Sequence, residues 1–130
     1  MKKVEEVCRL SGISRRTLQY YDNEGVLPAK RSKENYRLYD EEALKRLWEI
    51  LWYKEMGFNL EEIKVILAVP QGERNNYLEQ KIQSIEGKIQ DLEKQKRFIR
   101  QVEKYGIIPL PVNEGEYGEN YREYIKKIKG

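Results

Sequence analysis

Apolar residues in the first part of the chain recur at helical spacing, in short stretches separated by turn residues. Val4, Val7 and the cysteine that follows fall at positions i, i+3 and i+4, which predicts a short amphipathic helix closed by Gly12. Ser14 is placed to cap a second helix that ends at Gly25. Two short helices joined by a glycine-containing turn, the second opening with two arginines, predict a helix-turn-helix.

Residues 26–40 change to the pattern of a β-hairpin. Pro28 prevents the second helix from continuing, and Tyr36, Leu38 and Tyr39 favour extended backbone. Basic and polar residues occupy the stretch between them. The pattern predicts a two-stranded hairpin, or wing, whose tip lies near residues 33–35 and whose Leu38 and Tyr39 pack against the rest of the fold.

Two further helices follow the predicted wing. Asp40 is placed to cap the third helix, and Gly57 to end it. Its apolar stripe predicts a core-facing side that includes both tryptophans: Leu44, Leu47, Trp48, Leu51 and Trp52. Asn59 and Glu62 have the spacing of a capping box, which predicts a fourth helix carrying Leu60, Ile63, Ile66 and Leu67.

A longer helix is predicted after the boundary at residues 70–72. Its apolar residues alternate at steps of four and three and form a coiled-coil seam: Leu78, Ile82, Ile85, Ile89, Leu92 and Ile99. A helix over residues 73–105 is about 50 Å long, and a narrow apolar stripe of that length needs a partner. An identical chain is the simplest one. We therefore expect a first domain at 1–71, a dimerisation helix at 72–105 and a tail at 106–130.

The tail begins with a break at Pro109 and Pro111 and ends in one short amphipathic helix, in which Ile125 and Ile128 share the apolar face with two tyrosines. Four tyrosines lie in or next to the tail: Tyr105, Tyr117, Tyr121 and Tyr124. We expect them to pack on the first domain of a partner chain. Lining a pocket for a small apolar ligand is the alternative.

Composition narrows the chemistry that the chain can perform. The 130 residues include no histidine and one cysteine, which removes imidazole bases, His-paired nucleophiles and imidazole metal ligands. We expect no enzyme activity, no cofactor and no metal site, with Cys8 buried as a small apolar side chain. No apolar run approaches the roughly 20 residues of a membrane span, and no secretory signal is present, so we expect a cytoplasmic protein. A net charge of +3 is too small to identify a partner.

Three segments together resemble the DNA-binding region of the MerR family of bacterial transcription regulators. They read "SRRTLQYYDNEGVL", "NYRLYDEEALKRL" and "KEMGFNLEEIKVIL", and they occur in the order and spacing of that family. The resemblance implies a mainly α-helical fold, with a winged helix-turn-helix followed by an antiparallel coiled coil of two chains. It also implies that the dimer binds an inverted-repeat operator in a promoter, bends and untwists it, and so controls initiation by RNA polymerase.

The resemblance assigns roles to individual positions. Five residues match family positions on the recognition helix that face DNA: Arg15, Arg16, Thr17, Gln19 and Tyr20. Tyr36 and Arg37 match the pair on the wing that contacts the DNA backbone, and Lys54 matches a basic phosphate contact. These types suit the roles, because arginine binds guanine or phosphate with two donors and glutamine pairs with adenine. Tyr21, one turn after Leu18, is expected in the core, which leaves Tyr20 facing DNA.

The chain departs from the family at two residues, and its wing is about one residue shorter than is usual there. Gln19 stands where many members have arginine, so the base preference of relatives does not transfer. Asn35 replaces the usual glycine before the Tyr-Arg pair, and asparagine tolerates the left-handed conformation that such a turn needs. The family's metal sensors carry cysteines at the dimerisation helix, where this chain has none, so we do not expect a thiol-based metal sensor.

The sequence leaves several interpretations open. The signal that controls such a regulator is a small organic effector or another protein, or the regulator has no effector. An architectural, excisionase-like DNA binder is a second reading, which the long dimerisation helix disfavours. A coiled-coil module whose first domain binds protein is a third, which the paired arginines and the wing disfavour.

Overall fold

The computed structural model describes residues 1–111 and 120–130, and these form two compact units. The first, Met1–Arg74, is called the head, and the second, Asn75–Gly130, is called the tail unit. Most of the described chain is helical, and one small antiparallel sheet lies in the head. The fold class predicted from the sequence is confirmed for the winged helix-turn-helix and for the long helix that follows it.

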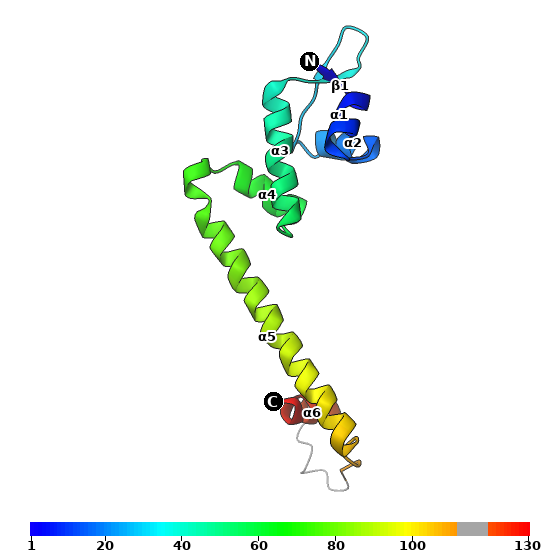
Figure 1. The fold of residues 1–130 in the computed structure, drawn as a ribbon, viewed down its shortest axis with the longest axis vertical. Helices are drawn as coiled ribbons and strands as arrows, with labels where there is room; N and C mark the ends of the chain where they lie inside the picture. The colour runs from blue at the N-terminus through cyan, green and yellow to red at the C-terminus, as the bar shows by residue number, and fades with distance from the viewer. Residues whose placement is uncertain (112–119) are drawn as a thin grey trace. The chain divides into compact units, whose positions relative to one another are not determined.

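The helix-turn-helix consists of α1 (Val4–Ser11) and α2 (Arg15–Asn23), which pack against each other in the head (Figure 1). Gly12 ends α1 with a φ of 75°, and its amide donates to the carbonyl oxygen of Cys8, 2.9 Å away. The Ser14 side chain caps α2 by accepting a hydrogen bond from the backbone amide of Thr17 at 3.1 Å. Both caps agree with the sequence-based prediction.

The wing is a three-stranded antiparallel sheet rather than the predicted two-stranded hairpin. Its strands β2 (Lys30–Arg31) and β3 (Arg37–Tyr39) form the hairpin, and β1 (Lys2–Lys3) pairs with the other edge of β3. Lys2 lies opposite Tyr39 and Lys30 lies opposite Leu38, so β3 is the central strand. A strand of two lysines has no apolar alternation, so no residue pattern predicted β1.

The next two helices, α3 (Glu41–Glu55) and α4 (Leu60–Leu67), begin at the predicted caps. The Asp40 carboxylate accepts from the amide of Ala43 at 2.8 Å. Asn59 and Glu62 form both hydrogen bonds of a capping box, each at 2.9 Å. These caps satisfy amides that the first turn of each helix leaves without a backbone partner.

The predicted core-facing stripe of α3 is wrong for the two tryptophans. Trp48 is 63% exposed and Trp52 is 56% exposed. The residues that α3 buries are Leu47, Ile50 and Tyr53. Residues 50–53 are all apolar or aromatic, so two overlapping stripes are available along this helix. The packing of the head selects the one that excludes the tryptophans.

The core of the head combines residues from every helix and from the central strand. Its fully buried side chains are Val7, Leu18, Val26, Leu27, Tyr39, Ile50, Ile63 and Ile66. Tyr21, 6% exposed, also lies in this core, as predicted. Cys8 does not: it is partly exposed, because Val7 rather than Cys8 occupies the buried centre of the α1 face.

Arg74 completes the head after the short 3₁₀ turn η1 (Gln71–Glu73). It is buried, and its Nε donates to the carbonyl oxygen of Val69 at 2.8 Å. Its Nη1 reaches the Tyr53 hydroxyl at 3.2 Å and Glu49 Oε2 at 3.4 Å. A buried guanidinium needs such partners, and these attach the last residue of the head to α3.

The tail unit is built on α5 (Asn75–Tyr105), an unbroken helix of 31 residues (Figure 1). None of its residues is buried within the chain. The predicted seam lies open to solvent, with Ile82 48%, Ile89 53% and Ile99 59% exposed. An amphipathic helix that leaves its apolar stripe uncovered is not stabilised by packing within its own chain.

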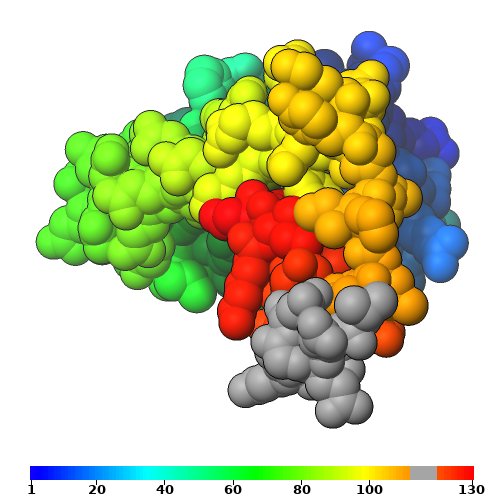
Figure 2. Space-filling view, turned by 90° about the horizontal axis from the view of Figure 1, so that it is seen from below, coloured from blue at the N-terminus to red at the C-terminus, as the bar shows by residue number. Residues whose placement is uncertain are grey.

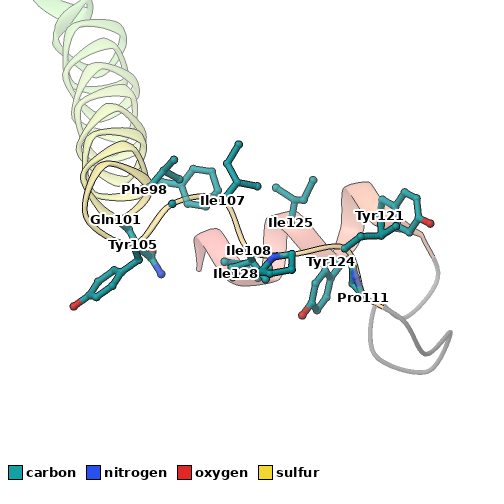
Figure 3. Close-up of a pocket in the computed structure, with 14 residues that line it drawn as sticks. Phe98, Gln101, Tyr105, Ile107, Ile108, Pro111, Tyr121, Tyr124, Ile125 and Ile128 are labelled. Atoms are coloured by element: carbon teal, nitrogen blue, oxygen red, sulfur yellow. The ribbon is translucent and has the colours of Figure 1, made fainter.

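The tail unit ends in α6 (Tyr121–Lys129), which lies beside the end of α5 and the segment that follows it (Figure 2). The three together enclose a hollow of about 740 Å³, called the tail hollow. Phe98 and Ile107 form its side nearest α5, and Tyr121, Tyr124 and Ile125 reach it from α6 (Figure 3). Of the tail tyrosines, Tyr105, Tyr121 and Tyr124 line the hollow, whereas Tyr117 lies outside the described residues.

Candidate nucleic-acid interface

The helix α2 presents two faces of opposite character. Leu18 and Tyr21, three positions apart, are buried and fix the inner face. Arg15, Arg16 and Gln19 are therefore exposed, and the Tyr20 side chain is 52% exposed. A short helix held by its inner face, with arginines at its N-terminal end and amide and phenol groups beyond them, suits insertion into a major groove.

Two residues at the start of α2 already have partners within the chain. Nη2 of Arg15 lies 3.4 Å from Glu5 Oε1, in an ion pair whose side chains are 66% and 87% exposed. Such a pair is weak and leaves the arginine free to turn toward another anion. The Thr17 hydroxyl is 2.9 Å from Ser14 Oγ, and its amide is the one that Ser14 caps. Thr17 therefore helps to form the start of α2.

Asp22, at the end of α2, is the residue that joins this helix to the wing. Its Oδ2 accepts a hydrogen bond from Arg37 Nε at 2.8 Å and lies 3.5 Å from Nη2 of Arg31. Its Oδ1 accepts from the amide of Ala29 at 3.2 Å. One carboxylate thus contacts both strands of the hairpin and the segment leading to them, and it fixes the wing against the recognition helix.

The charge state of Asp22 follows from these contacts. Partial burial alone would raise the pKa of this carboxyl. The hydrogen bonds from Arg37 and from the Ala29 amide, with the positive charges of Arg37 and Arg31, outweigh burial and hold the Asp22 pKa below its ordinary value. Asp22 is therefore ionised at neutral pH.

The tip of the wing is closed by the asparagine that replaces the usual glycine. Asn35 has a φ of 67°, which confirms that it adopts the left-handed conformation. Its amide donates to the Ser32 carbonyl oxygen at 2.9 Å, and its own carbonyl oxygen accepts from Arg31 Nη1 at 3.3 Å. The next residue, Tyr36, projects outward with 66% of its surface exposed.

The predicted DNA-contacting residues do not all have the same surroundings. Arg37 has a side chain only 21% exposed and already pairs with Asp22, so it has a structural role in the free chain. Lys54 is exposed in the last turn of α3. The recognition helix and the wing are joined by Asp22, whereas among the described residues no hydrogen bond or ion pair joins Lys54 to either of them.

Sequence reasoning missed the residues that hold this surface together. Asp22 and Arg31 were not singled out, nor was Arg46, whose Nε donates to the Val26 carbonyl oxygen at 2.6 Å. Nor was Lys64, whose Nζ lies 3.0 Å from Glu24 at the end of α2. A lone acidic residue between two basic stretches was the available signal for Asp22.

Within residues 1–111 and 120–130, no cluster of three or more Cys, Asp or Glu side chains is placed to hold a metal ion. No helix in that part of the chain combines the length and the apolar character needed to cross a membrane.

Comparison with known families places the head and α5 in one family. Residues 2–69 match the family described as MerR HTH family regulatory protein, and residues 44–102 match the family described as MerR, DNA binding. One curated relative is the HTH-type transcriptional activator mta of Bacillus subtilis (strain 168), 35% identical over 115 residues. That alignment covers 88% of this chain but only 42% of the relative.

Solved structures give the same result. The N-terminal part of MtaN, the Bacillus subtilis multidrug transporter activator, aligns with a TM-score of 0.74 at 35% identity, covering 78% of this chain and 97% of that one. The transcription regulator PbrR691 from Ralstonia metallidurans CH34, solved in complex with lead(II), aligns with a TM-score of 0.70 at 26% identity. That alignment covers 88% of this chain and 94% of the PbrR691 chain.

Proposed function

This chain belongs to the MerR family of HTH regulatory proteins, and from that premise we propose that it is a transcription regulator. As a homodimer, it binds an inverted-repeat operator in a promoter and distorts the DNA to control initiation by RNA polymerase. The observation that carries the proposal is the rigid attachment of an exposed recognition helix to a wing through Asp22. Such an attachment keeps two DNA-contacting elements in one fixed orientation.

The proposal divides the chain by role. Residues 1–71 bind DNA, residues 72–105 pair two chains in an antiparallel coiled coil, and residues 106–130 form the tail. On the recognition helix, Arg16, Gln19 and Tyr20 contact base edges, with Arg15 and Thr17 at its start. Tyr36, Arg37 and Lys54 contact phosphates and position the protein without reading sequence.

Dimerisation is supported by the exposure of five of the six residues of the α5 seam. Residues Ile82, Ile85, Ile89, Leu92 and Ile99 are between 41% and 59% exposed in the single chain. A row of isoleucine and leucine side chains along one face of a solvated helix is stabilised when a second copy covers it. Two copies also supply the two-fold symmetry that an inverted repeat requires. The effector and the sign of regulation are not assigned.

The test is binding of the full chain to a duplex selected from a randomised inverted-repeat library, followed by fluorescence anisotropy at several salt concentrations. We expect affinity to fall steeply with added salt, because phosphate contacts release counterions from DNA. Arg16→Ala should weaken binding roughly tenfold or more, the loss expected for one arginine contact to a base edge. Its melting temperature should stay at the wild-type value, because Arg16 is exposed.

Lys45→Ala is the matched control. Lys45 is an exposed base on α3 whose Nζ lies 3.9 Å from Glu42 Oε1, so its removal also takes one positive charge from the head. We expect this variant to bind the selected duplex nearly as well as the wild type. Equal losses of duplex affinity in the two variants would show that the effect of Arg16→Ala comes from net charge alone. A salt-independent interaction, or no selected duplex at all, would favour a protein-binding module.

A further inference from the structure

Within the described part of the chain, two apolar surfaces have no role in the core of the head or in the proposed contact with DNA. The first is the tryptophan pair, Trp48 and Trp52, on α3. The rings lie one helical turn apart, 6.0 Å between centroids in an edge-to-face arrangement, and both are more than half exposed. An aromatic pair of this size, standing beside a complete core, is typical of a docking surface.

The second surface is the tail hollow. Among residues 1–111 and 120–130, no charged side chain lines it, and its apolar residues are exposed to solvent: Ile107 is 84%, Leu110 70% and Ile125 51% exposed. Its volume of about 740 Å³ falls within the range of roughly 300–1,000 Å³ that accepts a drug-sized apolar body. Two adjacent indole rings are a body of that kind.

The seam of α5 determines which head such a hollow can meet. Full antiparallel overlap of the seam sets Ile99 of one chain opposite the partner's Leu78, and therefore Tyr105 opposite the partner's Gly72. The hollow begins at Phe98 and extends past Tyr105, so it lies beside the end of the partner's head. Parallel pairing would instead leave each hollow about 35 Å along α5 from the nearest head, since Asn75 and Phe98 are 23 residues apart.

The tryptophan pair belongs to the part of the head that lies at this junction. Arg74, the last residue before α5, is bound by Glu49 and Tyr53. These two residues directly follow Trp48 and Trp52 in α3. The turn of α3 that carries the tryptophans is therefore bound to Arg74, the last residue of the head, and in the antiparallel register the partner's hollow lies opposite this end of the head.

Charge favours the same contact. Residues 94–111 and 120–130, which surround the hollow, contain nine Lys or Arg and only two Glu. Residues 41–74, which carry the tryptophan pair, contain seven Glu and five Lys or Arg. A basic rim around an apolar centre, facing a region with an acidic excess, steers the two surfaces together.

From these observations we propose that the tryptophan pair of each chain packs into the tail hollow of its partner, giving two equivalent head-to-tail contacts in each dimer. The inference rests on the antiparallel dimer of the proposed function. It assigns the tail a structural role in the dimer, because each tail contacts the partner's head near the end of the paired α5 helices.

The chain contains only two tryptophans, so its tryptophan emission reports on this pair alone. We expect the wild-type dimer to emit at short wavelength, as buried indole does. Leu110→Asp, which places a charge in the hollow, should shift the emission to long wavelength. Leu10→Asp is the matched control, because Leu10 is 59% exposed on α1 and lies outside the hollow. It should leave the emission unchanged.

Mixed dimers identify which chain supplies the hollow. A Leu110→Asp chain that keeps its tryptophans is mixed with an excess of a Trp48→Phe/Trp52→Phe chain, which has no tryptophan but an intact hollow. We expect the short-wavelength emission to return. An excess of a tryptophan-free chain that also carries Leu110→Asp should not restore it.

Sedimentation at the same concentrations separates this inference from the proposed function. A wild-type chain that sediments as a monomer would overturn the antiparallel dimer, and the head-to-tail contact would be refuted together with it. A wild-type dimer whose emission does not respond to Leu110→Asp would overturn the head-to-tail contact alone. Emission that shifts with Leu110→Asp but is not restored in mixed dimers would assign the hollow to the chain's own tryptophans and would equally refute the inference.

Discussion

Replacing Asp22 with asparagine tests the idea that one carboxylate fixes the wing against the recognition helix. The change keeps the shape of the side chain and an oxygen that accepts from the Ala29 amide. It removes the negative charge that Arg37 Nε binds at 2.8 Å and that Arg31 approaches at 3.5 Å. We expect a less stable head and weaker operator binding.

The size of the effect follows from the burial of the groups. A hydrogen bond to a charged group contributes about 1.5–3 kcal/mol, against about 0.5–1.5 kcal/mol for a neutral one. The Asp22 and Arg37 side chains are 16% and 21% exposed, so solvent screens the pair only partly. The Arg31 side chain is 43% exposed and contributes little. The expected loss is about 1–2 kcal/mol, which lowers the melting temperature of a unit of this size by roughly 5–15 °C.

The assay combines thermal melting at pH 7 with operator binding at a temperature where the variant is fully folded. Glu24→Gln is the matched control, since it removes the same charge from the end of the same helix. Glu24 contacts Lys64 on α4 rather than the wing. We expect this control to change melting less than Asp22→Asn and to leave operator affinity close to the wild-type value.

The dependence on pH separates charge from shape. Because the Asp22 pKa is lowered in the folded head, its stabilising effect is complete above the unfolded pKa of about 3.9 and is lost as the pH falls through the folded pKa. The stability difference between the wild type and Asp22→Asn should therefore be full at pH 7 and shrink below about pH 4. A difference that stays constant into the acid range, or equal melting at pH 7, would refute the ion-pair reasoning.

Five further substitutions, at four positions, test other contacts by urea or thermal unfolding. Among buried side-chain polar atoms of the described residues, the Tyr39 hydroxyl is the one without a hydrogen-bond partner. Tyr39→Phe should therefore leave the free energy of unfolding unchanged or raise it by about 1 kcal/mol. A clear loss of stability would mean that the hydroxyl does have a partner. Arg74→Lys should cost about 2 kcal/mol despite keeping the charge, because an ammonium cannot reach Val69, Tyr53 and Glu49 together; wild-type stability would contradict this. Asn59→Ala should cost about 1 kcal/mol through loss of the capping box, and no change would remove its role. Asn35→Gly should be nearly neutral, whereas Asn35→Val should cost about 1–2 kcal/mol at a φ of 67°; equal stability of the two variants would argue against a left-handed tip.

The features that the sequence predicted correctly depend on interactions between near neighbours. Ser14, Asp40 and Asn59 were recognised as caps because each side chain binds an amide three positions further along the chain. The left-handed turns at Gly12 and Asn35 are likewise properties of single residues. Such interactions are visible in the order of residues alone.

The features that the sequence did not predict depend on distant partners. The hydrogen bond between Asp22 and Arg37 spans 15 residues, and that between Glu49 and Arg74 spans 25. The strand β1 forms only because β3 offers it an edge. The exposure of the tryptophan pair depends on which of two overlapping α3 stripes the rest of the head covers. Tertiary packing decides each of these.

The chain order of the contacts in the head has a consequence for synthesis on the ribosome. The hydrogen bonds and ion pairs described for the head all close between Lys2 and Arg74, and the seam begins only after them. A growing polypeptide therefore contains every residue of the head before α5 has been synthesised. In the proposed dimer, pairing would then join two heads that are already complete, so a defect in the seam should yield folded single chains rather than misfolded protein.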